Sequence, residues 1–147
     1  MTCVIEKIAL GHCHATCVCF DDKAILIRGA SGVGKSALAL QLMGLGAQLV
    51  ADDQVILDEQ TGAIIAHCPK PLVGLVEVRG VGVLKTPCKV CATVSLVVDM
   101  DTAPCKRMPL HYMVEIGSHH VEAIAGEGVL NLPMAVRLLT LYGRKQS

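Results

Sequence analysis

Short apolar runs, punctuated by glycine, proline and paired acidic residues, recur along most of the chain. Their length and their content of β-branched residues favour strands over helices. Asp21 and Asp22 mark one turn, and residues 59–62 mark the turn of a hairpin. The pattern predicts strands at Thr2–Leu10, Thr16–Phe20, Ala24–Arg28, Ala47–Ala51, Val55–Leu57, Ala63–Ala66, Leu75–Arg79 and Thr93–Asp99.

Helix-forming residues dominate two further segments. Ser36–Leu45 follows a glycine-rich loop, and glycines near its end supply the stop signal. Met134–Tyr142 is the second predicted helix, with Pro133 near its first turn. Between the last strand and this helix, the polar and proline-bearing stretch Asp101–Pro109 is predicted to be a loop.

The segment from Ala24 to Ala51 has the order strand, loop, helix, strand. Such a unit implies a parallel pair of strands joined by a right-handed crossover. Aromatic residues are scarce, with no Trp, one Phe and two Tyr, so the core must be aliphatic, which suits buried parallel strands. We therefore expect an α/β fold with a mixed β-sheet, built as a single domain over residues 1–147.

The charge balance narrows the classes of function. Thirteen basic residues match thirteen acidic ones, which argues against a broad surface for nucleic acid or anionic membrane. No apolar run approaches the roughly 18 residues of a membrane span, and the N-terminus lacks a signal-peptide pattern. We therefore expect a cytoplasmic protein with no nucleic-acid or membrane partner. In that setting, most of the eight cysteines are expected to be buried thiols.

The glycine-rich loop carries the most informative motif. It matches G-x-x-x-x-G-K-[ST] in full, between an apolar strand and a helix. Its glycines let backbone N–H groups turn inward onto phosphate oxygens, and the helix N-terminus adds positive potential. Lys35 can reach the β- and γ-phosphates, and the Ser36 hydroxyl can ligate Mg²⁺. The predicted nucleotide-binding residues are Gly29, Ala30, Ser31, Gly32, Val33, Gly34, Lys35 and Ser36.

Two acidic residues, Asp52 and Asp53, follow the next predicted strand. Ligands of open α/β sheets bind at the carboxyl ends of the strands. One carboxylate there can hold Mg²⁺ through water, and the other can accept a proton from a substrate hydroxyl. In isolation the pair is equally consistent with a solvated turn, but beside a complete phosphate loop we interpret it as part of the same site.

Glu77 and Arg79 alternate with apolar residues, so we expect them on one face of a strand. The carboxylate can add a metal ligand, and the guanidinium can neutralise phosphoryl oxygens. Taken alone, the segment is equally consistent with an exposed strand face that bears a cross-strand ion pair.

In this order, the motifs resemble the catalytic domain of the HPr kinase/phosphorylase family. Gly-Ala-Ser-Gly-Val-Gly-Lys-Ser is followed by Leu-Val-Ala-Asp-Asp and then by Glu-Val-Arg-Gly-Val-Gly. His14 stands where the family has a histidine before its phosphate-loop strand pair. Arg107 follows a strand that ends in Asp99, as in the family pattern. The resemblance covers roughly residues 10 to 110.

The resemblance implies a role for each matching residue. Asp53 is expected to act as the base when a serine is phosphorylated, and as the acid in the reverse direction. Positively charged groups and His14 are expected to support phosphate or transition-state charge. The expected catalytic residues are Asp53, Lys35, His14, Arg79 and Arg107, and the expected metal ligands are Ser36, Glu77 and Asp52.

The resemblance also implies ATP and Mg²⁺ as cofactors, and an HPr-type phosphocarrier protein as the partner. The implied fold is the P-loop kinase core shared with phosphoenolpyruvate carboxykinases, usually assembled as a hexamer. The chain resembles the short α-proteobacterial form without the N-terminal domain, and the C-terminal segment tied to dephosphorylation is short. Two alternatives stay open: a P-loop phosphotransferase for a small molecule, and a module that binds ATP and a partner without turnover.

Several other features suggest sites but favour a simpler interpretation. The histidines and cysteines at residues 12–19 and the C-x-x-C at 88–91 would need converging ligands to bind zinc. Alternation along a strand separates them, so we expect ordinary thiols. His119 and His120 are interpreted as a polar turn. The apolar stripe of Met134, Leu138 and Leu141 is expected to be a packing face of the second helix.

Overall fold

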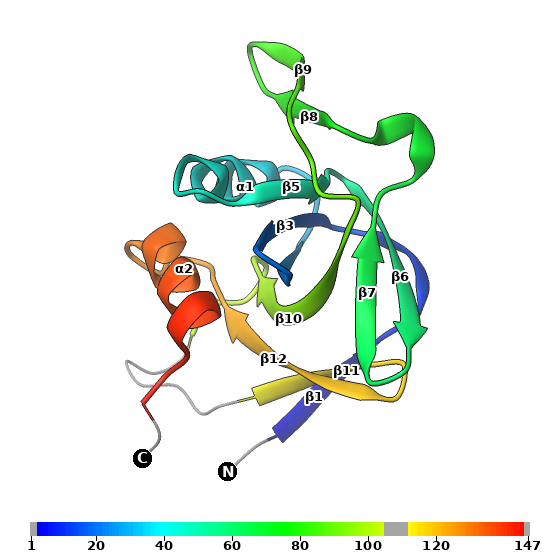
Figure 1. The fold of residues 1–147 in the computed structure, drawn as a ribbon. Coiled ribbons are helices and arrows are strands. Elements are labelled where there is room, and N and C mark those ends of the chain that lie inside the picture. The colour runs from blue at the N-terminus through cyan, green and yellow to red at the C-terminus, as the bar shows by residue number, and fades with distance from the viewer. Residues whose placement is uncertain (1–2, 105–111, 146–147) are drawn as a thin grey trace.

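The computed structural model of the protein describes residues 3–104 and 112–145. Within these residues, a ten-stranded mixed sheet forms the body, α1 and α2 pack on one side of it, and an arm formed by β8 and β9 stands away from it (Figure 1). The elements are β1 (Cys3–Ile8), β2 (Gly11–His14), β3 (Thr16–Phe20), β4 (Lys23–Arg28), α1 (Lys35–Gly44), β5 (Gln48–Ala51), β6 (Gln54–Gln60), β7 (Ala63–His67), a 3₁₀ turn (Lys70–Leu72), β8 (Leu75–Val78), β9 (Gly82–Lys85), β10 (Cys91–Asp99), β11 (Tyr112–Ile116), β12 (His119–Ala125) and α2 (Leu132–Tyr142).

The long strand β10 connects the parts of the sheet. The main strand order is β1-β11-β12-β10-β4-β3-β5, and β2, β6 and β7 extend the sheet from β10. The first residues of β10 pair antiparallel with β7, whereas its later residues pair parallel with β4 and β12. The expected α/β fold with a mixed sheet is confirmed.

The central strands are buried on both faces, which explains their nearly continuous apolar runs. In β4, Leu26 packs into a core with the β2–β6–β7 side of the sheet. Its neighbours Ile25 and Ile27 pack on the opposite face with Leu42 of α1 and Val136 of α2. Aliphatic side chains dominate both faces, as the scarcity of aromatic residues predicted.

The parallel pair expected from the strand–loop–helix–strand unit does not form. β4 and β5 run in the same direction, but β3 lies between them and pairs antiparallel with each. The turn at Asp21 and Asp22 joins β3 directly to β4 as a hairpin, so the place beside β4 is already taken. The chain therefore passes over β3 through α1. The carboxyl ends of β4 and β5 still lie at the same edge of the sheet.

The second helix presents a different face to the core than the sequence predicted. Its buried residues are Leu132, Val136 and Thr140, whereas Met134 and Leu138 are exposed. The expected packing stripe was therefore wrong for Met134 and Leu138, whereas its third member, Leu141, is half-buried against the core. The buried residues lie two positions away from Met134 and Leu138, which is nearly the opposite face of the helix. No helix within residues 3–104 and 112–145 is long and apolar enough to cross a membrane.

Several strands carry too weak a local signal to be predicted, among them β2, β9, β11 and β12. His119 and His120, expected as a turn, instead begin β12, and the turn lies at Gly117 and Ser118. His119 is opposite Ile116 in the β11–β12 ladder. Pairing in such a ladder gives each residue its backbone hydrogen bonds even where the strand propensity of the residue is low, so the local sequence does not reveal the strand.

A carboxylate joins the tips of the β6–β7 and β11–β12 hairpins. Glu59 of β6 accepts hydrogen bonds from the backbone N–H of Ser118, at 3.1 Å, and from the Ser118 hydroxyl. Its oxygen also lies 3.5 Å from Nδ1 of His119. The Ser118 hydroxyl, then the Ser118 N–H and the His119 charge, hold the pKa of Glu59 below its ordinary value of 4.5. The two hairpins are thus linked by hydrogen bonds that are strongest when the Glu59 side chain is ionised.

This link should make stability depend on acid pH. The folded pKa of Glu59 is below the unfolded one, so the unfolded chain takes up the proton first as pH falls. The contribution is complete above pH 4.5 and is lost as pH drops through the folded pKa. We expect wild type to have a higher urea midpoint than Glu59→Gln at pH 7, and the difference to shrink as pH falls below 4.5 and through the lower folded pKa. Glu127→Gln, another exposed glutamate, serves as the control. A pH-independent difference would contradict the link.

Candidate functional site

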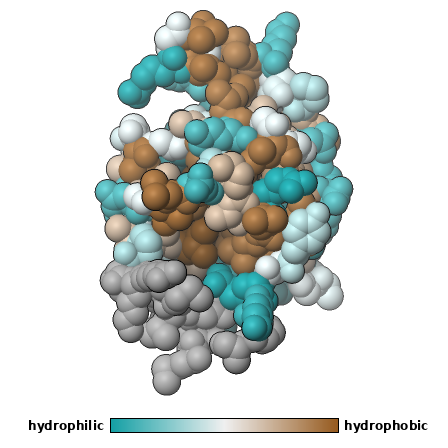
Figure 2. All heavy atoms as spheres, turned by 90° about the vertical axis from the view of Figure 1, so that its left-hand side faces the viewer, coloured by the Kyte–Doolittle hydropathy of each residue, from teal (hydrophilic) through white to brown (hydrophobic). Residues whose placement is uncertain are grey.

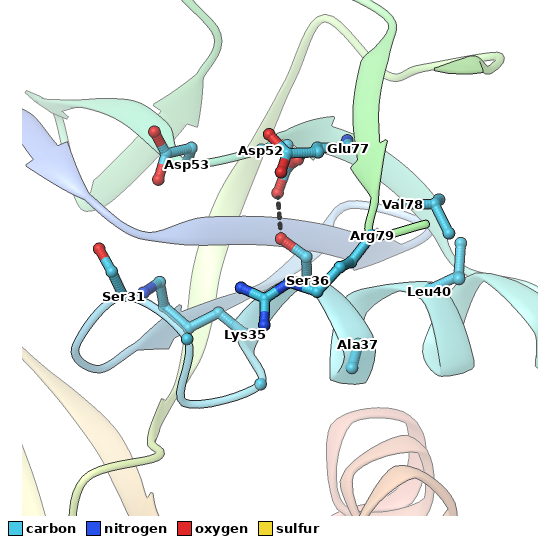
Figure 3. Close-up of a pocket in the computed structure, with 12 residues that line it drawn as sticks. Ser31, Lys35, Ser36, Ala37, Leu40, Asp52, Asp53, Glu77, Val78 and Arg79 are labelled. Atoms are coloured by element: carbon cyan, nitrogen blue, oxygen red, sulfur yellow. Dashed lines mark hydrogen bonds between the residues drawn. The ribbon is translucent and has the colours of Figure 1, made fainter. Parts of the chain in front are cut away.

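The glycine-rich loop joins β4 to α1 at the sheet edge where β4 and β5 end. A pocket of about 520 Å³ opens beside it, between the loop, the turn after β5 and the base of the arm (Figure 3). This volume lies in the usual range for small-molecule sites. The lining residues are Ser31, Gly32, Gly34, Lys35, Ser36, Ala37, Leu40, Asp52, Asp53, Glu77, Val78 and Arg79.

Glycines are required at both ends of the loop. Gly34, which precedes α1, has a φ of 108°, in the left-handed region that residues with a side chain avoid. A Cβ on Gly29 would lie only 2.6 Å from Cγ1 of Val33, inside the loop. The loop can therefore fold tightly against the start of α1, where N–H groups at the helix N-terminus favour anions.

Lys35 holds the loop together from within. Its Nζ donates hydrogen bonds to the carbonyl oxygens of Gly29, at 2.7 Å, and Ala30, at 3.0 Å. The residue is only 7% exposed although it lines the pocket. An anionic ligand in the loop would offer the ammonium group a stronger partner than these neutral carbonyls. Lys35 therefore has a structural role as well as the ligand-binding role expected from the motif.

The Asp52 side chain connects the elements around the pocket. Its Oδ1 accepts hydrogen bonds from the hydroxyls of Ser36, at 2.8 Å, and Thr16, at 3.1 Å. Its Oδ2 accepts the backbone N–H of Glu77 at 2.9 Å. The buried carboxylate therefore fixes the start of α1, the start of β3 and the base of the arm relative to one another. Thr16 was not predicted from the sequence; its only signal is a polar side chain at the head of an otherwise apolar strand.

Asp53 points away from Asp52, although the two residues are adjacent. Its φ of 69° is in the left-handed region, and Gln54 N–H closes the turn on the Asp52 carbonyl at 2.8 Å. Aspartate tolerates this region better than most residues, and strained turns of this kind concentrate at functional sites. The Asp53 side chain remains 65% exposed at the pocket. Its Oδ1 lies 3.4 Å from Nδ1 of His14, which is itself half exposed.

The arm contributes the remaining side chains. Glu77 and Arg79 both line the pocket from the end of β8. Arg79 extends from the arm toward the phosphate loop (Figure 3). The structure thus brings together most of the predicted site, from the loop, Asp52 and Asp53 to His14 and the arm residues. Arg107 lies outside the described residues.

The oxygen donors in the pocket fit Mg²⁺. The Ser36 hydroxyl and the Asp52 carboxylate are in direct contact, and Glu77 offers a second carboxylate. Mg²⁺ is commonly held by one or two carboxylates together with substrate phosphates and water. Within the described part of the chain, no group of three His, Cys, Asp or Glu side chains could hold a metal by itself. A Mg²⁺ ion held by Ser36, Asp52 and Glu77 would leave coordination positions for phosphate oxygens and water.

The loop and its acidic partner have the arrangement that the phosphate-loop motif predicted. Comparison with known proteins gives the family. Residues 7–91 match the model of the HPr Serine kinase C-terminal domain. The chain therefore belongs to the HPr serine kinase C-terminal domain family. The matched segment contains every predicted site residue except Arg107.

Individual relatives agree with this assignment. The chain is 42% identical over 71 residues to an HPr kinase/phosphorylase of Clostridium botulinum, which is 48% of this chain and 23% of the relative. It is 54% identical over 61 residues to that of Bordetella pertussis, 41% of this chain and 20% of the relative. The matches thus span less than a quarter of these relatives' length. The solved structure of the Hpr(Ser) kinase/phosphatase from Coxiella burnetii aligns over 87% of each chain, with 26% identity and a TM-score of 0.74.

The different positions of the adjacent aspartates predict different effects on stability. Asp52→Asn replaces one acceptor oxygen by a donor, so it cannot satisfy Ser36, Thr16 and Glu77 together. We expect it to lower the free energy of unfolding by about 1–3 kcal/mol, the cost of unpaired buried groups. Asp53→Asn, at an exposed position, should change it by less than about 0.5 kcal/mol. Urea unfolding measures both, and equal effects would contradict a structural role for Asp52.

Proposed function

We propose that the chain is the catalytic domain of an ATP-dependent protein kinase that phosphorylates a serine of an HPr-type phosphocarrier. The observation that carries the proposal is the geometry of the acidic pair. Asp52 binds Ser36 of the phosphate loop, while Asp53 turns outward toward His14 at the mouth of the same pocket. This difference supports assigning Asp52 to the nucleotide and its metal, and Asp53 to the hydroxyl of an incoming protein.

Positioning and charge neutralisation provide most of the rate enhancement in phosphoryl transfer. The loop N–H groups and the start of α1 bind the phosphates, and Lys35 exchanges its loop carbonyls for phosphate oxygens. Arg79 approaches from the arm and neutralises charge that develops on the transferred group. Mg²⁺, when bound near Ser36, Asp52 and Glu77, neutralises the β- and γ-phosphate oxygens. Because ATP is the donor, the proposal places the protein in the cytoplasm.

Asp53 is the group that we assign to proton transfer. The serine oxygen attacks the γ-phosphorus in line as the bond to the ADP oxygen breaks. The Asp53 carboxylate takes the proton from the serine hydroxyl. His14, 3.4 Å from this carboxylate, orients it. The relatives' names include phosphorylase, so the proposal extends to dephosphorylation of the phosphoserine. In that direction the Asp53 carboxyl returns the proton to the serine oxygen.

Asp53→Asn tests the assignment because it keeps the shape and removes the basic oxygen. We expect affinity for Mg²⁺–ATP to stay within a few-fold, while radiolabel transfer from ATP to purified HPr falls by about 100-fold or more, the span of positioned acid–base groups. The matched control is Asp58→Asn. Asp58 is also an exposed carboxylate paired with a histidine, His67 at 2.5 Å, but it lies on β6 outside the pocket.

The two assays separate the possible failures. Wild-type transfer that survives in Asp53→Asn would contradict the base assignment while leaving the kinase intact. Nucleotide binding without transfer to HPr, or transfer to a small molecule instead, would replace the proposal by one of the alternatives that the sequence left open.

Apolar side chains on the helical side of the molecule support association with copies of the same chain. Met134, Leu138 and Tyr142 are spaced four residues apart on α2 and are all exposed, so they share an outward face. Figure 2 views this side and shows apolar side chains gathered there. Surfaces of this kind mark interaction sites more often than free surface. We therefore propose that the protein is a homo-oligomer, with the hexamer of the family resemblance as the expected form.

Oligomer size can be measured directly by light scattering. We expect wild type at tens of micromolar, a concentration at which a contact of roughly 7 kcal/mol would be populated, to be larger than a monomer. Leu138→Glu should reduce the mass, because it places a charge in the middle of the exposed face formed by Met134, Leu138 and Tyr142. Val90→Glu, at a position 79% exposed before β10, is the control and should leave the mass unchanged. A monomeric wild type would contradict the proposal.

A further inference from the structure

A carboxylate from outside the phosphate-binding motif contacts the loop on its outer side. Both carboxylate oxygens of Asp101 lie 3.0 Å from the backbone nitrogen of Ala30, which donates its N–H to them. Asp101 lies 71 residues further along the chain and beyond the segment that matches the family model. A Cβ on Gly29 would come within 3.3 Å of the same carboxylate. Only a glycine there leaves Asp101 its ordinary distance from the loop.

Asp101 is held in place by the end of β10. Asp99, the last residue of that strand, accepts the backbone N–H of Asp101 at 2.9 Å and the hydroxyl of Thr102 at 2.9 Å. The strand itself pairs with β4, with Asp99 opposite Arg28, and the N–H of Met100 bonds to the Arg28 carbonyl at 2.8 Å. The turn that carries Asp101 is therefore fixed to the strand from which the phosphate loop emerges.

The Ala30 residue is consequently held from two sides. Its N–H is bound by Asp101, and its carbonyl accepts Lys35 Nζ at 3.0 Å and the N–H of Val33 at 3.2 Å. A nucleotide that draws Lys35 toward its phosphates removes one of these contacts. Neither Ala30 nor Asp101 lines the pocket, so the bond between them can persist when ligand is bound.

We propose that Asp101 is a positioning residue for nucleotide binding: it keeps the first turn of the phosphate loop in its binding conformation while Lys35 exchanges loop carbonyls for phosphate. This inference rests on the proposed nucleotide site. A loop already in its bound conformation loses less conformational freedom when the ligand arrives, so the effect falls on affinity rather than on the chemical step.

The proposal predicts a change in nucleotide affinity that is opposite in sign to the change expected from charge repulsion alone. Asp101 carries a negative charge beside a loop that binds polyphosphate. By Coulomb's law alone, removing this charge should tighten the binding of an anionic ligand. If the carboxylate anchors the loop, its removal should instead weaken binding. The sign of the change therefore distinguishes an anchor from a surface charge.

The experiment is calorimetric titration of the full chain with Mg²⁺ and a non-hydrolysable ATP analogue. We expect Asp101→Ala to weaken binding by about tenfold, the effect of losing roughly one hydrogen bond to a charged group. Asp101→Asn keeps an acceptor oxygen and loses the charge, so it should bind within about threefold of wild type. The control is Asp22→Ala, which removes a charge at the other end of β4 and β10 from the phosphate loop. It should change affinity by less than about twofold, since salt screens charges separated by more than about 10 Å.

Kinetics and the Ala30 amide give independent readouts. Asp101→Ala should raise the KM for ATP and leave kcat for transfer to HPr within about twofold, as expected for a loss of uniform binding. Hydrogen exchange at the Ala30 amide should accelerate in this variant and not in Asp101→Asn. If the alanine variant does not fold, Asp101→Ser provides the same comparison, because its hydroxyl is too short to replace the carboxylate.

Each outcome has a defined meaning. Equal or tighter binding by Asp101→Ala, or an unchanged Ala30 amide, would overturn the role of Asp101 while the nucleotide site stands. If Asp101→Ala and Asp101→Asn weaken nucleotide binding equally, the role of Asp101 would also be overturned, because the side-chain oxygen kept in the asparagine variant would then make no difference. Failure of wild type to bind the analogue would instead overturn the proposed function on which the inference rests.

Discussion

The hydrogen bonds to the Asp52 carboxylate are the interaction on which the site depends. They tie the hydroxyls of Thr16 and Ser36 and the backbone of Glu77 to one buried group. Those partners belong to β3, α1 and β8, which have no common local sequence. Because a buried carboxylate is costly without such partners, the elements must meet at this point for the folded state to be stable. The hydrogen bonds that stabilise the fold therefore also hold the walls of the pocket together.

The turn at Asp53 gives two identical side chains different chemistry. A left-handed residue between β5 and β6 sends one carboxylate inward and the next toward solvent. The inward group accepts three hydrogen bonds from three elements, which gives it a structural role. The outward group keeps its oxygens available, with His14 as its neighbour. The left-handed conformation of Asp53 thus separates a carboxylate that holds the site together from one that stays exposed at the pocket.

The arm is anchored to the body beside the pocket, because Val76 of β8 is buried in the core next to α1 and the N–H of Lys89 bonds to the Leu49 carbonyl at 2.9 Å. The backbone of Glu77 is fixed by Asp52, yet β8 and β9 pair only with each other within the described residues. Arg79 therefore reaches the pocket from a small sheet that stands beyond the main body (Figure 1).

The sequence by itself determined the local parts of this protein. The phosphate loop, the acidic pair, α1 and the central strands follow from spacing and apolar runs, since each depends on neighbours along the chain. Tertiary structure decided that β3 separates β4 from β5, that Thr16 meets Asp52, and that Asp101 reaches Ala30. It also decided which face of α2 is buried. These features depend on strand order and register, which bring together residues that no local pattern relates.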